Sequence, residues 1–74
     1  MSHLLDLRGV VCPVNFVKAR LFLDKVASGT VVELILDAGE PVESVFSSIK
    51  AEGHLVDNPK PREDGTFSLT IQKA

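Results

Sequence analysis

The sequence is short of cysteine, of large aromatic residues and of long apolar runs. Its 74 residues include one cysteine, four phenylalanines, no tryptophan and no tyrosine. A single cysteine excludes an internal disulfide and leaves intermolecular pairing, chemistry or burial. No run of about 18 uncharged apolar residues occurs, which excludes a membrane-spanning helix. The paired cysteines and histidines of a metal site are also missing, so no metal is expected.

Strong charge of either sign is missing as well. Eight basic and ten acidic side chains give a net charge of −2. Nucleic-acid binders carry a basic patch or stripe, whereas the positive charges here are scattered, so direct nucleic-acid binding is not expected. The first residues lack the basic segment of a signal peptide, and a cytoplasmic location is therefore expected. Phosphate-binding and nucleophile-elbow motifs are absent, which argues against a cofactor-dependent or hydrolytic enzyme.

What the sequence does contain is a clear alternation of strand and helix patterns. Apolar residues make up 45% of the chain, enough for the core of one domain spanning residues 1–74. The expected elements, in order, are a strand at 3–8, a helix at 13–27, a strand at 30–36, a helix opening near Pro41 and ending at Gly53, a strand at 54–58, a loop at 59–65 and a strand at 66–72.

This βαβαββ order predicts the fold class. Strands joined through a helix should be parallel, and the last two strands should pair as an antiparallel hairpin. Two helices cannot cover both faces of such a sheet, so we predict an α/β two-layer sandwich with a four-stranded mixed sheet and both helices on one face. The open face should then expose Glu33, Ser68 and Thr70.

The first helix should bury one apolar stripe against this sheet. Its apolar residues recur at helical spacing. The stripe that we expect to face the core consists of Val14, Val17, Leu21 and Phe22, and it is widened by Phe16, Ala19, Leu23 and Val26. The loops that open the two helices, at 9–12 and 37–41, should lie side by side at one edge of the sheet. A functional site is therefore expected between them.

Cys12 is the strongest candidate for chemistry in that site. It precedes Pro13, and proline favours the first helical position, so Cys12 is expected at the N-cap. Free backbone N–H groups and the helix dipole there favour the nucleophilic thiolate. Arg8 and Lys18 are nearby cations that could stabilise the anion, or else they are solvated surface charges. The alternative for Cys12 itself is a small, buried, inert side chain.

Polar residues at the two helix starts leave further alternatives open. Asn15 would occupy N3, where it could reach back to the Cys12 N–H as a capping box, or donate its amide to the thiolate. Asp37, Glu40 and Glu43 at the start of the second helix complement the helix dipole, or form an acidic rim for a basic partner.

A family resemblance runs over nearly the whole chain. The chain resembles the TusA-like (SirA-type) sulfur-carrier family, whose signature is D-x-R-G-x-x-C-P-x-P with a lysine a few residues on. The matching residues are Asp6, Arg8, Gly9, Cys12, Pro13 and Lys18. Asn15 stands in the place of the second signature proline.

The resemblance implies a two-layer α/β fold and a sulfurtransferase-type persulfide carrier without a cofactor. Cys12 would take sulfane sulfur from a donor protein, a cysteine desulfurase or a rhodanese, and pass it to an acceptor protein. Pro13 would open the helix behind it, while Asp6, Arg8 and Gly9 would shape the loop. The family serves tRNA thiolation, molybdenum cofactor and sulfur oxidation, and the sequence does not choose among them. Two other interpretations stay open: a non-catalytic module that binds a protein or RNA on the same fold, and a thiol redox sensor.

Overall fold

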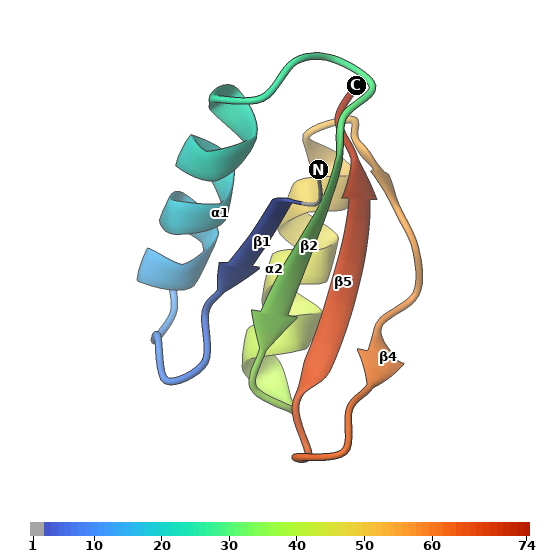
Figure 1. The fold of residues 1–74 in the computed structure, drawn as a ribbon. Coiled ribbons are helices and arrows are strands. Elements are labelled where there is room, and N and C mark those ends of the chain that lie inside the picture. Colours follow the sequence, from blue (N-terminus) through green and yellow to red (C-terminus); the bar gives the residue numbers. More distant parts are fainter. Residues whose placement is uncertain (1–2) are drawn as a thin grey trace.

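The computed structural model describes residues 3–74 (Figure 1). Met1 and Ser2, which belong to the expected domain, lie outside the described residues. In chain order the elements are β1 (His3–Asp6), α1 (Val14–Asp24), β2 (Val31–Leu36), α2 (Glu40–Ala51), β3 (Leu55–Val56), β4 (Lys60–Pro61) and β5 (Phe67–Gln72). None of the helices in residues 3–74 has the length and apolar character needed to cross a membrane.

The centre of the sheet is formed by β2 and β5, which run antiparallel to each other. β1 pairs with β2 in parallel, and β3 and β4 both pair antiparallel with β5. The register places Leu34 of β2 between Leu5 of β1 and Leu69 of β5. The predicted parallel first pair and antiparallel β3–β5 pair are confirmed, and the sheet is mixed as expected.

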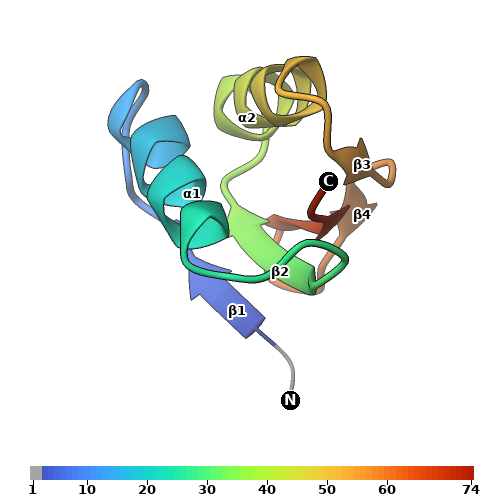
Figure 2. The ribbon, with the colours of Figure 1, turned by 90° about the horizontal axis from the view of Figure 1, so that it is seen from above.

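Both helices cover the same face of this sheet (Figure 2). This arrangement confirms the predicted α/β two-layer sandwich. Alternate residues of β2 point toward the helices, because successive side chains of a strand face opposite sides. The buried core comprises Leu7, Ala19, Leu23, Val32, Leu34, Leu36, Val42, Val45, Ile49, Leu69 and Ile71.

The prediction of four strands is wrong by one short strand. Lys60 and Pro61, in the segment 59–65 expected to be a loop, pair with β5 and form β4. A strand of two residues is too short to show an alternation of apolar and polar residues in the sequence. The proline is tolerated in β4 because this strand lies at an edge of the sheet. Ser68, opposite Lys60, is therefore 9% exposed rather than open to water, whereas Glu33 is exposed as expected.

The face of α1 that packs on the sheet was predicted only in part. Ala19 and Leu23, expected at the margin of the stripe, are buried, and Phe22 packs against the core. Val14, Val17 and Leu21 were expected in the core, but they are 44%, 49% and 55% exposed. The buried positions recur every four residues and are Asn15, Ala19 and Leu23. α1 carries apolar residues on two sides, so helical spacing alone cannot decide which side faces the sheet. The polar Asn15 favoured the wrong choice, and the helix is shorter than the expected 13–27.

Candidate functional site

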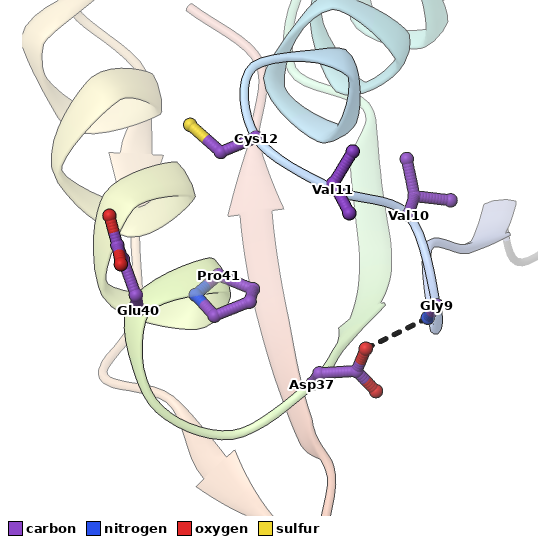
Figure 3. A pocket seen from close by; sticks show the side chains of 7 residues that line it. All are labelled: Gly9, Val10, Val11, Cys12, Asp37, Glu40 and Pro41. Atoms are coloured by element: carbon purple, nitrogen blue, oxygen red, sulfur yellow. Dashed lines mark hydrogen bonds between the residues drawn. The ribbon is translucent and has the colours of Figure 1, made fainter.

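The loops that precede the two helices are joined by a hydrogen bond. The backbone N–H of Gly9 donates to Oδ2 of Asp37 across 2.8 Å (Figure 3). Gly9 adopts a φ of 76°, a conformation that residues with a Cβ rarely take. The Asp37 side chain thus ties the β2–α2 loop to the β1–α1 loop. The predicted proximity of the two loops is confirmed, and this linking role of Asp37 was not foreseen.

A cavity of about 380 Å³ opens between these loops. Its lining consists of Gly9, Val10, Val11, Cys12, Asp37, Glu40 and Pro41. Cys12 is exposed, so the alternative of a buried, inert sulfur is wrong. The side chain of Cys12 points toward α2 (Figure 3). The cavity can therefore admit a small group, or a short segment of a partner, to the sulfur from outside.

The helix start differs from the expected one by one residue. α1 begins at Val14 and its N-cap is Pro13, so Cys12 lies just before the cap rather than on it. Pro13 has φ −94° and ψ 8°, which is outside the helical region. The first free N–H groups of the helix therefore start further from the sulfur than the sequence indicated.

Two N–H groups in the first turn of α1 are also engaged elsewhere. The N–H of Asn15 donates to the carbonyl of Val11 at 3.1 Å, and the N–H of Phe16 donates to Oδ1 of Asn15 at 2.7 Å. Asn15 thus caps its neighbour instead of reaching back to Cys12. Its side chain is completely buried, and its Nδ2 finds no hydrogen-bond partner within residues 3–74. Neither of the two roles expected for Asn15 is observed.

The side chain that does reach the sulfur comes from α2. Sγ of Cys12 lies 3.8 Å from Oγ of Ser44, and the two residues are 32 positions apart in sequence. Ser44 was missed because no local pattern links it to Cys12. One signal could have found it, since Ser44 follows Glu40 by four residues and so shares the helix face that borders the predicted site. A hydroxyl there can donate a hydrogen bond to an anionic sulfur.

Asp6 and Arg8 are joined to each other rather than to the sulfur. The backbone N–H and Nε of Arg8 donate to Oδ1 of Asp6 at 3.0 and 2.9 Å, and its Nη1 donates to Oδ2 of Asp64 at 3.1 Å. The hydrogen bonds from Arg8 lower the pKa of Asp6 to about 2. Hydrogen bonds from Thr66, above all from its hydroxyl, lower the pKa of Asp64 to about 2, with smaller help from Arg62 and Arg8.

This ion-pair group fixes the end of β1 to the turn between β4 and β5. Arg8 is thereby directed at two carboxylates, whose hydrogen bonds and charges raise its pKa. Lys18 is not part of the cavity either and lines a separate depression with Leu21 and Lys25. The structure therefore brings Gly9 to the sulfur cavity, and leaves both expected cations outside its lining.

No cluster of metal-ligand side chains is present in the part of the chain that the structure describes. The donor side chains that line the cavity are the carboxylates of Asp37 and Glu40 and the thiol of Cys12, and the Ser44 hydroxyl lies 3.8 Å from that sulfur. The chemistry that this arrangement offers is that of an accessible sulfur nucleophile.

Comparison with known proteins agrees with this chemistry. Residues 3–73 match the family described as "Sulfurtransferase TusA". A protein of Archaeoglobus fulgidus named "Putative sulfur carrier protein" is 33% identical over 72 residues, which cover 97% of this chain and 82% of that protein. An Escherichia coli K12 protein named "Putative sulfur carrier protein TsuB" is 29% identical over 70 residues, 95% of this chain and 93% of that one.

The fold has a close counterpart among solved structures. The crystal structure of the SirA-like protein from Desulfitobacterium hafniense superposes with a TM-score of 0.82 at 20% sequence identity. The match covers 97% of this chain and 96% of that one. This likeness supports the two-layer fold, and the match over residues 3–73 decides the family. With its exposed cysteine at the junction of two loops, the chain belongs to the TusA family of sulfurtransferases.

Proposed function

We propose that Cys12 carries sulfane sulfur as a persulfide and relays it from a donor protein to an acceptor protein. The observation that carries the proposal is the position of Cys12: it is the one cysteine of the chain, it is exposed, and it borders a cavity between two loops. A persulfide is a reversible cap on a cysteine and needs an accessible sulfur. Membership of a sulfurtransferase family supports the same chemistry.

Loading and unloading are two nucleophilic displacements at sulfur. In loading, the Cys12 thiolate attacks the outer sulfur of a donor persulfide, the donor S–S bond breaks, and the donor cysteine leaves as a thiolate. In unloading, an acceptor thiolate attacks the outer sulfur now on Cys12, and Cys12 leaves as a thiolate. Each step forms one S–S bond and breaks another, so no external oxidant or reductant is needed. One cysteine per carrier is sufficient.

The remaining signature residues act on the shape of the site in this proposal. Gly9 lets the first loop turn toward Asp37, while the pairing of Asp6 with Arg8 fixes the end of β1 beneath that loop. Pro13 separates the cysteine from the first turn of α1. The whole chain then acts as one sulfur-presenting domain.

The proposal is tested by loading the protein and measuring its intact mass. Incubation with a cysteine desulfurase and free cysteine, or with a rhodanese and thiosulfate, should add one sulfur atom to the wild type and none to Cys12→Ser. A second incubation with glutathione persulfide loads the cysteine without a protein partner. If the wild type gains no sulfur from any of these donors while its thiol still reacts with iodoacetamide, the proposal is wrong.

A further inference from the structure

A row of apolar side chains is exposed on one side of α1. Val11, Val14, Val17 and Leu21, which we call the α1 row, are 70%, 44%, 49% and 55% exposed. Positions 14, 17 and 21 lie on one side of the helix by their spacing. The row holds four of the seven large exposed apolar residues in the described chain. A helix packed on a sheet usually presents polar residues to water, so a second apolar side indicates a surface that contacts something else.

Two lysines border this row. Lys18 and Lys25 line a depression of about 230 Å³ together with Leu5, Leu21 and Phe22. Neither lysine has a carboxylate within 4.0 Å in residues 3–74, whereas Arg20 of the same helix lies 3.4 Å from Glu52. The depression is therefore lined by three apolar side chains and two lysines that have no carboxylate partner in the described chain.

The row also reaches the sulfur. Val11 directly precedes Cys12 and lines the cavity that contains it. A protein that brings its own cysteine to Cys12 must cover this neighbourhood, and α1 is the element that continues from it. A partner that exchanges sulfur with Cys12 would therefore contact the α1 row, because the row lies directly beside the cysteine.

We propose that the α1 row, with Lys18 and Lys25, is the docking surface for the protein that exchanges sulfur with Cys12. The partner would present an apolar patch edged by Asp or Glu side chains beside its reactive cysteine, because opposite charges steer association and fix the register. This inference rests on the proposed function. A second copy of this chain fits less well, since it would bring one pair of unpaired lysines toward another.

The test compares protein donors with a small-molecule donor in matched variants. Leu21→Ser alters the α1 row, and Leu55→Ser is its control, because Leu55 is a 68% exposed leucine on the strand β3. The rate of sulfur transfer to Cys12 is measured from persulfide-loaded cysteine desulfurases and rhodaneses, and separately from glutathione persulfide. We expect Leu21→Ser to slow transfer from the protein donor by about tenfold, with Leu55→Ser unchanged. Transfer from glutathione persulfide should be the same for all three proteins.

Charge reversal tests the lysines separately. The double variant Lys18→Glu and Lys25→Glu should slow transfer from the protein donor. Because salt screens charges, the difference in transfer rate between this variant and wild type should become smaller as the salt concentration is raised. Lys60→Glu, on β4, is the control.

Three results would overturn the docking proposal. One is a Leu21→Ser protein as fast as wild type with every protein donor. Another is a wild type that loads from glutathione persulfide but from no protein donor. The third is a dimer in sedimentation experiments that Leu21→Ser converts to monomer. Failure of the wild type to load even from glutathione persulfide would instead refute the proposed function itself.

Discussion

The sulfur of Cys12 lies 3.8 Å from the hydroxyl oxygen of Ser44, across the junction of the two helices. Asp37 and Glu40 line the cavity that also contains this sulfur. Within the described chain, Ser44 supplies the hydrogen-bonding side chain next to the sulfur. The hydroxyl is therefore the side-chain group able to donate a hydrogen bond to the sulfur.

We expect Ser44→Ala to slow the reaction of Cys12 with iodoacetamide at pH 7 by about three- to tenfold, the effect of one modest hydrogen bond. Loading from glutathione persulfide should slow by a similar factor. Ser44→Thr keeps the hydroxyl and should retain most of the rate. Ser47→Ala, an exposed position on the same helix, is the control. Equal rates for Ser44→Ala and wild type would show that the hydroxyl does not act on the sulfur.

The Gly9–Asp37 hydrogen bond should control the position of the cysteine loop. Gly9→Ala places a Cβ at a φ of 76°, which costs about 1–2 kcal/mol in the free energy of unfolding. A loop that relaxes to a negative φ would lose the bond to Asp37, so sulfur loading should also slow. Asp37→Asn retains an acceptor oxygen and should load sulfur more nearly like wild type than Asp37→Ala does. Urea unfolding measures the loss of stability, and intact mass measures the rate of sulfur loading. An unchanged loading rate in both Gly9→Ala and Asp37→Ala would contradict the role of this hydrogen bond.

Asn15 should lower the stability of the folded protein. Its Nδ2 is buried without a partner, and such a group costs about 1–3 kcal/mol, while the bond from the Phe16 N–H to its Oδ1 returns about 1 kcal/mol. We expect Asn15→Leu, which has the same number and branching of side-chain heavy atoms, to be at least as stable as wild type. Asn15→Ala should be less stable than Asn15→Leu, because it leaves a void. Urea unfolding measures all three proteins, and a leucine variant less stable than wild type by over about 1 kcal/mol would disprove the explanation.

The Asp6–Arg8–Asp64 group predicts how stability depends on pH. The pKa values of Asp6 and Asp64 fall from 3.8 to about 2 in the folded protein, so the unfolded chain binds these protons first. The stabilisation is fully present above about pH 4 and is lost as the pH falls toward 2. Arg8→Met removes the hydrogen bonds that are the main cause of the lowered pKa of Asp6. The free energy of unfolding of this variant should therefore depend less steeply on pH between 4 and 2. Parallel curves for the two proteins over that range would be the contrary result.

Much of the fold could be predicted because its signals are local. The alternation of Val32, Leu34 and Leu36 defines β2, and the spacing of Val42, Val45 and Ile49 defines the buried face of α2. Once the order of strands and helices is known, the meeting of the two helix-opening loops follows from general connection rules. The position of the candidate site was therefore predictable.

The parts that could not be predicted depend on contacts between distant segments. Ser44 meets Cys12 only because α1 and α2 pack on one face of the sheet. Asp64 joins Arg8 across 56 positions of sequence. The centre of the buried face of α1 was ambiguous because apolar residues lie on two sides of the helix. Periodicity describes a single element, whereas these features are decided by how elements pack together.

The last strand along the chain, β5, occupies an inner position of the sheet, between β2 on one side and β3 and β4 on the other. Within residues 3–74, neither β3 nor β4 pairs with any strand that precedes it in sequence. During synthesis, the sheet therefore cannot close until β5 has left the ribosome, and an unfinished chain would lack the Asp64 contact that holds Arg8. The cysteine loop should reach its final shape only at that moment, so a nascent chain would present a thiol that is not yet organised for sulfur exchange.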